Sequence, residues 1–263
     1  MANTKKEVAT TGGLPFLAVA DEKAGLPAHI NADDNRGAEN VNSADLTLPR
    51  LRLVQYISDE LKKNSDSYIE GIEAGQLVNS VSKAVSDKLY VLPVYYERKF
   101  NVWRSRDAGG GLIASCFSET EAREELAKAC EAERISLDDE DRVNRTFDLI
   151  DTPTHYCLEI DPETGETSPI IIDMPSTKQK VSRSWNTNAR QKAGASFAHV
   201  WALSTVEETN RRKEDYFNYK VEYVGFATKE LYDKGEASYA EFAASVGKPA
   251  TETGTETEAK EEA

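Results

Sequence analysis

The sequence predicts a mainly β fold with added helices, of the α+β class, arranged as one small decorated barrel. A long β-type stretch, rich in β-branched and aromatic residues, runs from Leu89 to Trp103. A hairpin and several shorter strand patterns accompany it, with helical patterns before and after the hairpin. Strands and helices do not alternate at the even spacing of a doubly wound parallel sheet, which favours a barrel.

The strand predictions depend on alternation of apolar and polar residues. Leu51 and Leu53 alternate with arginines, so ordered structure should begin near Leu48 with a half-buried strand. A second short strand is expected at 76–81, and Pro93 puts the long stretch at an edge or a bulge. A period of two divides that stretch into a core face and a wetter face. The core face holds Tyr90, Leu92, Val94, Tyr96, Phe100 and Val102, with Arg98 as its one charged residue. The wetter face holds Val91, Pro93, Tyr95, Glu97, Lys99, Asn101 and Trp103.

Turn and capping signals place the remaining elements. Strand patterns at 156–160 and 170–172 flank the turn-rich DPETGETSP and predict a hairpin. Ser118 and Glu121 have the spacing of a capping box, which predicts a helix over 118–134. Further elements are expected in this order: a flexible turn at 107–111, a helix at 174–196, strands at 201–205 and 216–225, and a closing helix at 228–246.

The chain divides into a single folded domain and two polar arms. Residues 1–46 have few large apolar side chains, and 248–263 repeat Thr and Glu, so both should be disordered. The domain is expected at 47–247. The formal charge is −14, but the acidic residues concentrate in 119–141 and in the tail, so net acidity does not exclude a nucleic-acid site.

Composition and motifs give no reason to expect an enzyme. No apolar run reaches the roughly 18 residues of a membrane span, and MANTKKEVATTGG has no apolar signal-peptide core. Cys116, Cys130 and Cys157 should be reduced thiols, and the expected compartment is the cytoplasm of an infected host cell. The three histidines are far apart in sequence and no metal-ligand spacing occurs, so we expect neither a metal nor a cofactor.

Two segments combine cations with aromatic side chains, the combination that single-stranded nucleic acids require. Cations contact phosphates and aromatic faces stack on bases. Neither group of candidate residues is interrupted by a run of acids. The candidates are Tyr95, Arg98, Lys99, Trp103, Arg104 and Arg106 in the first segment, and Lys178, Lys180, Arg183, Trp185, Arg190 and Lys192 in the second.

A purely structural interpretation of the same residues stays open at this point. Trp185, Phe197 and Trp201 can be core residues, with the cations lying over the surface on their aliphatic stems. The wetter face of 89–103 can equally be an ordinary outer face covered in part by a loop. Only the folded arrangement can separate these interpretations from a binding site.

The motifs LPRLRLVQ, YIEGIEAGQLVNS, VLPVYYERKFNVW with RDAGGG, and YFNYKVEYVGF resemble a broad set of uncharacterised bacteriophage proteins over about 48–246. The overall layout resembles the single-stranded-DNA-binding proteins of tailed bacteriophages, which have one OB-type barrel and an acidic C-terminal tail. The resemblance implies an OB-like barrel and a role in replication or recombination. In the best-known proteins of that group the tail ends in an aromatic residue, whereas this chain ends in Glu-Glu-Ala.

The leading hypothesis is therefore a bacteriophage protein that coats single-stranded DNA without sequence preference and does no bond chemistry. Its acidic tail could also contact replication or recombination proteins, a homodimer is possible, and no membrane contact is expected. One alternative is a structural or assembly protein of the virion. A second alternative is an interaction protein whose acidic surfaces mimic DNA.

The acidic tail yields a first prediction. Five glutamates against Lys260 make 251–263 a polyanion that competes with DNA for a cationic surface. Deleting 249–263 should tighten binding of a single-stranded oligonucleotide, and the gain should shrink as salt rises because both interactions are screened. Dissociation constants of the full-length and truncated proteins at low and moderate salt test this. Equal constants at low salt would rule out competition.

Overall fold

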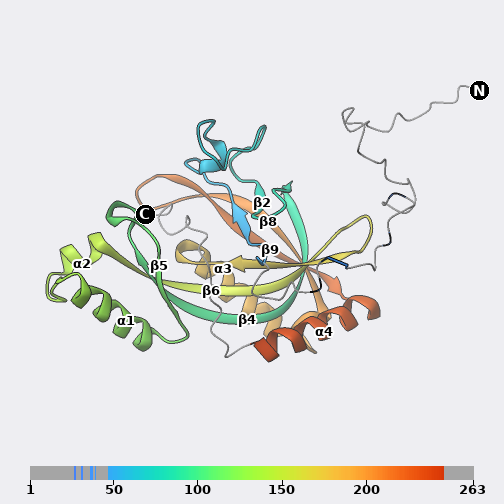
Figure 1. Ribbon diagram of the computed structural model, residues 1–263. Helices are drawn as coiled ribbons and strands as arrows, with labels where there is room; N and C mark the ends of the chain where they lie inside the picture. Colours follow the sequence, from blue (N-terminus) through green and yellow to red (C-terminus); the bar gives the residue numbers. More distant parts are fainter. Residues whose placement is uncertain (1–26, 28–30, 32–35, 38, 40–46, 246–263) are drawn as a thin grey trace, which may run out of the picture. The chain divides into compact units, whose positions relative to one another are not determined.

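The computed structural model in Figure 1 describes residues 27, 31, 36, 37, 39 and 47–245. The tail predicted at 248–263 lies outside the described residues, as does the predicted arm at 1–46 apart from its five isolated positions. From Thr47 onward the described residues belong to one compact unit, and the description below concerns that unit alone.

The unit contains two antiparallel sheets, and its described residues include four α-helices. The larger sheet has the order β7-β6-β4-β8-β9, and β5 pairs with one end of β4. Its strands are β4 (Lys88–Arg104), β5 (Leu112–Cys116), β6 (Phe147–Ile160), β7 (Thr167–Asp173), β8 (His199–Thr209) and β9 (Asp215–Phe226). The smaller sheet is formed by β1 (Leu51–Leu53), β2 (Leu77–Asn79) and β3 (Val85–Ser86). The helices are α1 (Glu119–Ala132), α2 (Glu140–Thr146), α3 (Gln179–Arg190) and α4 (Lys229–Ser245).

The α+β class is confirmed, but the expected closed, OB-like barrel is wrong. The larger sheet ends in β7 on one side and β9 on the other, and these two strands do not pair. The chain around β1 contacts both of them. Ile171 of β7 donates its N–H to the carbonyl of Pro49 at 2.8 Å, and the side-chain amide of Gln55 bonds both the N–H and the C=O of Phe217 in β9, each at 2.9 Å. These contacts bring the β1 region to both edge strands without a continuous ladder, so the sheet stays open.

Most predicted elements are present near their expected bounds. The strands at the start of the domain, the long central strand, the β6–β7 hairpin and the later strands are all confirmed. Helix α1 begins as the capping box predicted, because the Ser118 hydroxyl accepts the N–H of Glu121 at 3.2 Å.

Two helical regions differ from the prediction. The helix expected to reach residue 196 ends at Arg190, and Gly194 then takes a left-handed φ of 96°, which a continuing helix excludes. Helix α2 is not among the predicted elements. Asp139 caps it by accepting the N–H of Arg142 at 3.2 Å.

A β-bulge in β4 changes which side chains share a face of the sheet. The register with β6 shifts between Pro93 and Tyr95, where proline lacks the N–H that a regular ladder needs. Before the bulge, Tyr90 and Leu92 lie on the side of α4. After it, Tyr95 also lies on that side, whereas Tyr96 lies opposite His155 and contacts its ring. The prediction that Tyr90, Leu92, Tyr96 and Phe100 share one face is therefore wrong. Of the two alternatives predicted for Pro93, an edge strand or a bulge, the structure has the bulge.

Helices cover both faces of the larger sheet, α3 on one and α4 on the other (Figure 1). We call these the α3 face and the α4 face. Helix α1 packs on Phe100 and Val102, which alternate along β4 with Tyr96 and so belong to the α3 face. On the α3 face, Trp185 packs with residues from β1, β2, β4, β6, β7, β8 and β9. On the α4 face, Leu231, Tyr232 and Phe242 pack against Leu92 and its neighbours. Each face thus has an apolar core of its own.

A stack of aromatic rings attaches α3 to the sheet. The His155 and Trp185 rings are nearly parallel, with centroids 4.3 Å apart, and Trp185 meets Trp201 edge-on at 6.1 Å. The other neighbour of His155 is Tyr96, at 4.9 Å. The Nε2 of His155 also lies 2.8 Å from the hydroxyl of Ser182 on α3. Burial lowers the pKa of His155 to about 3, so this ring is neutral at pH 7.

The buried histidine predicts acid sensitivity. An exposed histidine in the unfolded chain has a pKa near 6.5 and binds a proton below that pH, whereas the folded His155 does so only near pH 3. The free energy of unfolding should therefore fall as pH drops from about 6.5 towards 3, by about 2 kcal/mol at pH 5 relative to pH 7. Urea unfolding of the native protein and of His155→Gln at both pH values measures this. An unchanged difference between the two pH values in the variant would contradict the assignment to His155.

Candidate nucleic-acid interface

The outer side of α3 carries an uninterrupted basic ridge. Val181, Trp185 and Ala189 recur every four residues and pack into the core. The same spacing turns the opposite side of the helix outward, and no acidic residue occurs in 179–190. The exposed residues of this ridge are Lys180, Arg183, Thr187 and Arg190.

A polar chain joins this ridge to the central strand. Arg98 of β4 forms a two-pronged ion pair with Asp151 of β6, with Nε and Oδ1 2.7 Å apart. Gln179 donates from its side-chain amide to the carbonyl of Asp151 at 2.9 Å. The Nε of Arg183 lies 3.4 Å from the carbonyl of Gln179. Arg98 and Arg183 thus come from the two segments that the sequence singled out, and they belong to one surface.

Tyr96 adds an aromatic ring to that surface. It lies on the α3 face, contacts His155 and remains 41% exposed. An exposed ring beside arginines is the arrangement that stacks on a base while the cations contact phosphates. We define the α3 surface by these residues: Tyr96, Arg98, Lys180, Arg183, Thr187 and Arg190.

Several cations of the predicted site are paired with carboxylates of the same chain. Arg98 pairs with Asp151, Lys180 with Glu208, and Arg104 with Glu133. Hydrogen bonding to Glu208 raises the pKa of Lys180 and, with bonds from Tyr216 and Asn218, lowers the pKa of Glu208. Among the five arginines of the predicted site, all within residues 47–245, Arg106, Arg183 and Arg190 form no ion pair with a carboxylate.

The bulge sends three predicted residues to the α4 face, away from the α3 surface. Tyr95 packs against Tyr156 and Tyr239 there. Lys99 pairs with Glu97 at 3.0 Å and is 16% exposed. Trp103 is half-buried on the same face. These residues do not join Arg98 and α3 in a single site.

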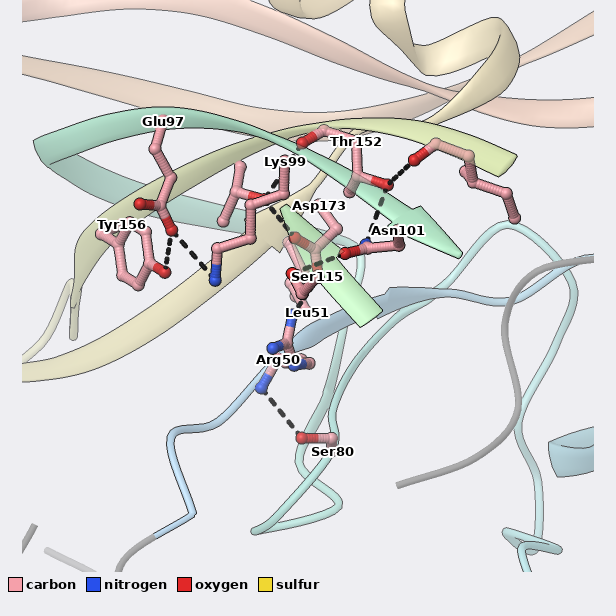
Figure 2. A network of polar contacts seen from close by, with 12 residues as sticks. Arg50, Leu51, Ser80, Glu97, Lys99, Asn101, Ser115, Thr152, Tyr156 and Asp173 are labelled. Atoms are coloured by element: carbon pink, nitrogen blue, oxygen red, sulfur yellow. Dashed lines mark hydrogen bonds and ion pairs between the residues drawn. The ribbon is translucent and has the colours of Figure 1, made fainter. Parts of the chain in front are cut away.

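Polar contacts hold the α4 face together near Lys99 (Figure 2). Figure 2 shows Glu97 between the Tyr156 hydroxyl and the Lys99 ammonium, and burial raises the pKa of Tyr156 to about 12. Asn101 bonds Thr152 at 3.3 Å and Ser115 at 2.7 Å. We interpret this network as structural, because its charged groups already satisfy one another.

The remaining predicted residues serve other contacts. Trp185 is only 2% exposed and packs inside the core, so we leave it out of the α3 surface. Lys178 lies over the ring of Tyr219, and Lys192 over those of Trp201 and Tyr223, the last at 3.5 Å. Arg104 and Arg106 lie at the far end of β4, where Arg104 contacts Glu133 and Phe147. Tyr96 was missed as a site residue, although Pro93 was a signal that the alternation breaks.

The structure holds no obvious alternative chemistry in the part that it describes. Within residues 47–245 no group of three His, Cys, Asp or Glu side chains is placed to hold a metal ion. The three cysteines are buried as free thiols, and burial raises the pKa of each. Of the described helices, none combines the length and apolarity needed to cross a membrane.

A family model described as Pam3 phage gp34-like protein matches residues 20–248. The chain belongs to this family. Membership agrees with the bacteriophage origin that the sequence predicted, and the family description names no activity. No curated protein and no solved structure is significantly similar to the chain. The α3 surface must therefore be interpreted from its own chemistry.

The bulge generates a paired prediction about adjacent tyrosines. Tyr96→Ala should weaken binding of a single-stranded oligonucleotide about tenfold, the effect of losing one stacked base. Tyr95→Ala should leave the affinity unchanged and lower the thermal unfolding temperature, because Tyr95 packs under α4. Fluorescence titration and thermal unfolding of both variants provide the test. The reverse assignment of the two effects would contradict the role given to Tyr96.

Proposed function

We propose that this bacteriophage protein binds single-stranded DNA through the α3 surface and does so without sequence preference. The observation that carries the proposal is the basic ridge of α3, which keeps Arg183 and Arg190 without carboxylate partners in a chain of formal charge −14. A surface that stays basic in an acidic protein favours an anionic ligand. An exposed Tyr96 beside Arg98 favours a ligand that has bases as well as phosphates.

The contacts of the α3 surface also favour a single strand over a duplex. Arg183 and Arg190 are seven residues apart, two helical turns, so they can contact successive backbone positions. Tyr96 can stack only on a base whose face is accessible, and bases in a duplex are already stacked on one another. Phosphate contacts and stacking do not depend on the identity of the base, which supports binding without sequence preference.

The biological role follows from that activity. A protein that coats single strands would act in replication or recombination, in the cytoplasm of the infected cell, and would do no bond chemistry. Its acidic tail would then be the segment through which replication or recombination proteins could bind. We propose no metal or cofactor for this activity, because phosphates and bases are recognised by side chains alone.

Salt dependence of binding tests the proposal. Titration of a labelled single-stranded oligonucleotide at several salt concentrations should give an affinity that falls steeply with salt. The double variant Arg183→Ala, Arg190→Ala should bind more weakly and reduce the slope of log affinity against log salt by about 1.4, or roughly 0.7 for each lost phosphate contact.

A matched control separates local contacts from net charge. Lys229→Ala, Lys234→Ala removes the same charge from α4, where both lysines form pairs within the helix, and should leave the slope unchanged. Equal slopes for the native protein and the double arginine variant would remove α3 from the interface. If the native protein binds no oligonucleotide and is found in purified virions, the assembly-protein alternative would replace the proposal.

A further inference from the structure

A pocket of about 320 Å³ opens beside the basic ridge, between α3 and β9. This volume is at the small end of the roughly 300–1,000 Å³ found for ligand sites, so it suits one small group. It is lined by Lys180, Val181, Ser184, Trp185 and Asn188 of α3 and by Val221 of β9.

Helical spacing explains why these residues meet. Val181, Ser184, Trp185 and Asn188 follow one another at intervals of three, one and three residues, which puts them on one flank of α3. That flank adjoins the ridge through Lys180, which belongs to both. A ligand group in the pocket is therefore next to the cations that would contact its phosphates.

The lining has the chemistry of a base site. Val181 and Val221 supply apolar contact for a planar heterocycle, and the buried Trp185 lines the inner wall. Among residues 47–245, neither the hydroxyl of Ser184 nor the amide of Asn188 is engaged in a hydrogen bond. An amide offers a donor and an acceptor together, and can therefore bond to the edge of any of the four bases. A lone phosphate would find one cation and a largely apolar wall.

We infer that this pocket takes one base of the bound single strand, while the strand's backbone follows Lys180, Arg183 and Arg190. The inference rests on the proposed function and makes it more specific. Tyr96 lies on the side of α3 that faces β4 and β6, and the pocket lies on the side that faces β9. A bound strand would thus cross α3, with the ridge between two base contacts.

Abasic oligonucleotides can separate base insertion from phosphate binding. The test titrates a thymidine oligonucleotide and an abasic one of equal length into the native protein and into Ser184→Phe, which fills the pocket from an exposed helix position. The variant should bind the thymidine oligonucleotide about tenfold more weakly than the native protein. Its affinity for the abasic oligonucleotide should equal that of the native protein, because that oligonucleotide has no base to enter the pocket.

Gln191→Phe is the control, since it adds the same ring to an exposed position next to α3 that does not line the pocket. It should behave as the native protein with both oligonucleotides. If Ser184→Phe lowers the affinity for both oligonucleotides equally, or for neither, the pocket holds no base. That result overturns the inference, while the proposed function stands. Failure of the native protein to bind either oligonucleotide would overturn both.

Discussion

The position of α3 depends on the buried His155. Its ring is stacked on Trp185 and lies within hydrogen-bonding distance of Ser182, so one side chain of β6 joins the helix to the sheet in two ways, and it also contacts Tyr96 of β4. A neutral imidazole can do this in an apolar core, whereas a charged one would require a partner that the core lacks. Because Trp185 is fixed inside, the ridge on the opposite side of the helix is fixed outside. The proposed interface is thus a consequence of core packing.

The element types could be predicted from the sequence, but the division of their residues between faces could not. The β-branched and aromatic composition of β4 and the capping box at Ser118 are local signals, and the structure follows them. The bulge after Pro93 is also local, but only the pairing with β6 determines where the extra residue falls. One inserted residue exchanges every side chain beyond it between the two faces. That exchange moved Tyr95 and Lys99 away from the candidate site and brought Tyr96 into it.

The pattern of strands in the sequence also could not predict that the sheet stays open. A barrel closes only if its edge strands pair, and that depends on contacts between residues far apart in sequence. Here the side chain of Gln55 bonds both backbone groups of Phe217 and takes the place of a strand there. Similarly, the basic composition of 98–106 could be recognised, but not that Arg104 would meet Glu133, which directly follows the last residue of α1. Composition identifies cations, and only the fold shows which of them are neutralised.

The ion pairs on the α3 surface bear on how a ligand could be bound there. The side chains of Arg98 and Lys180 are each more than half exposed in their pairs with Asp151 and Glu208, and exposed pairs contribute little to stability, about 0–1 kcal/mol. A phosphate could therefore take over these cations at small cost to the fold. The carboxylates left behind would repel the strand, which limits affinity and favours rapid release. Arg183 and Arg190 have no paired carboxylate, so under the proposed function they would supply most of the attraction for the strand. The ion pairs of Arg98 and Lys180 would keep the affinity moderate. Under the proposed function, that balance would suit a protein that must leave the strand before the strand is copied.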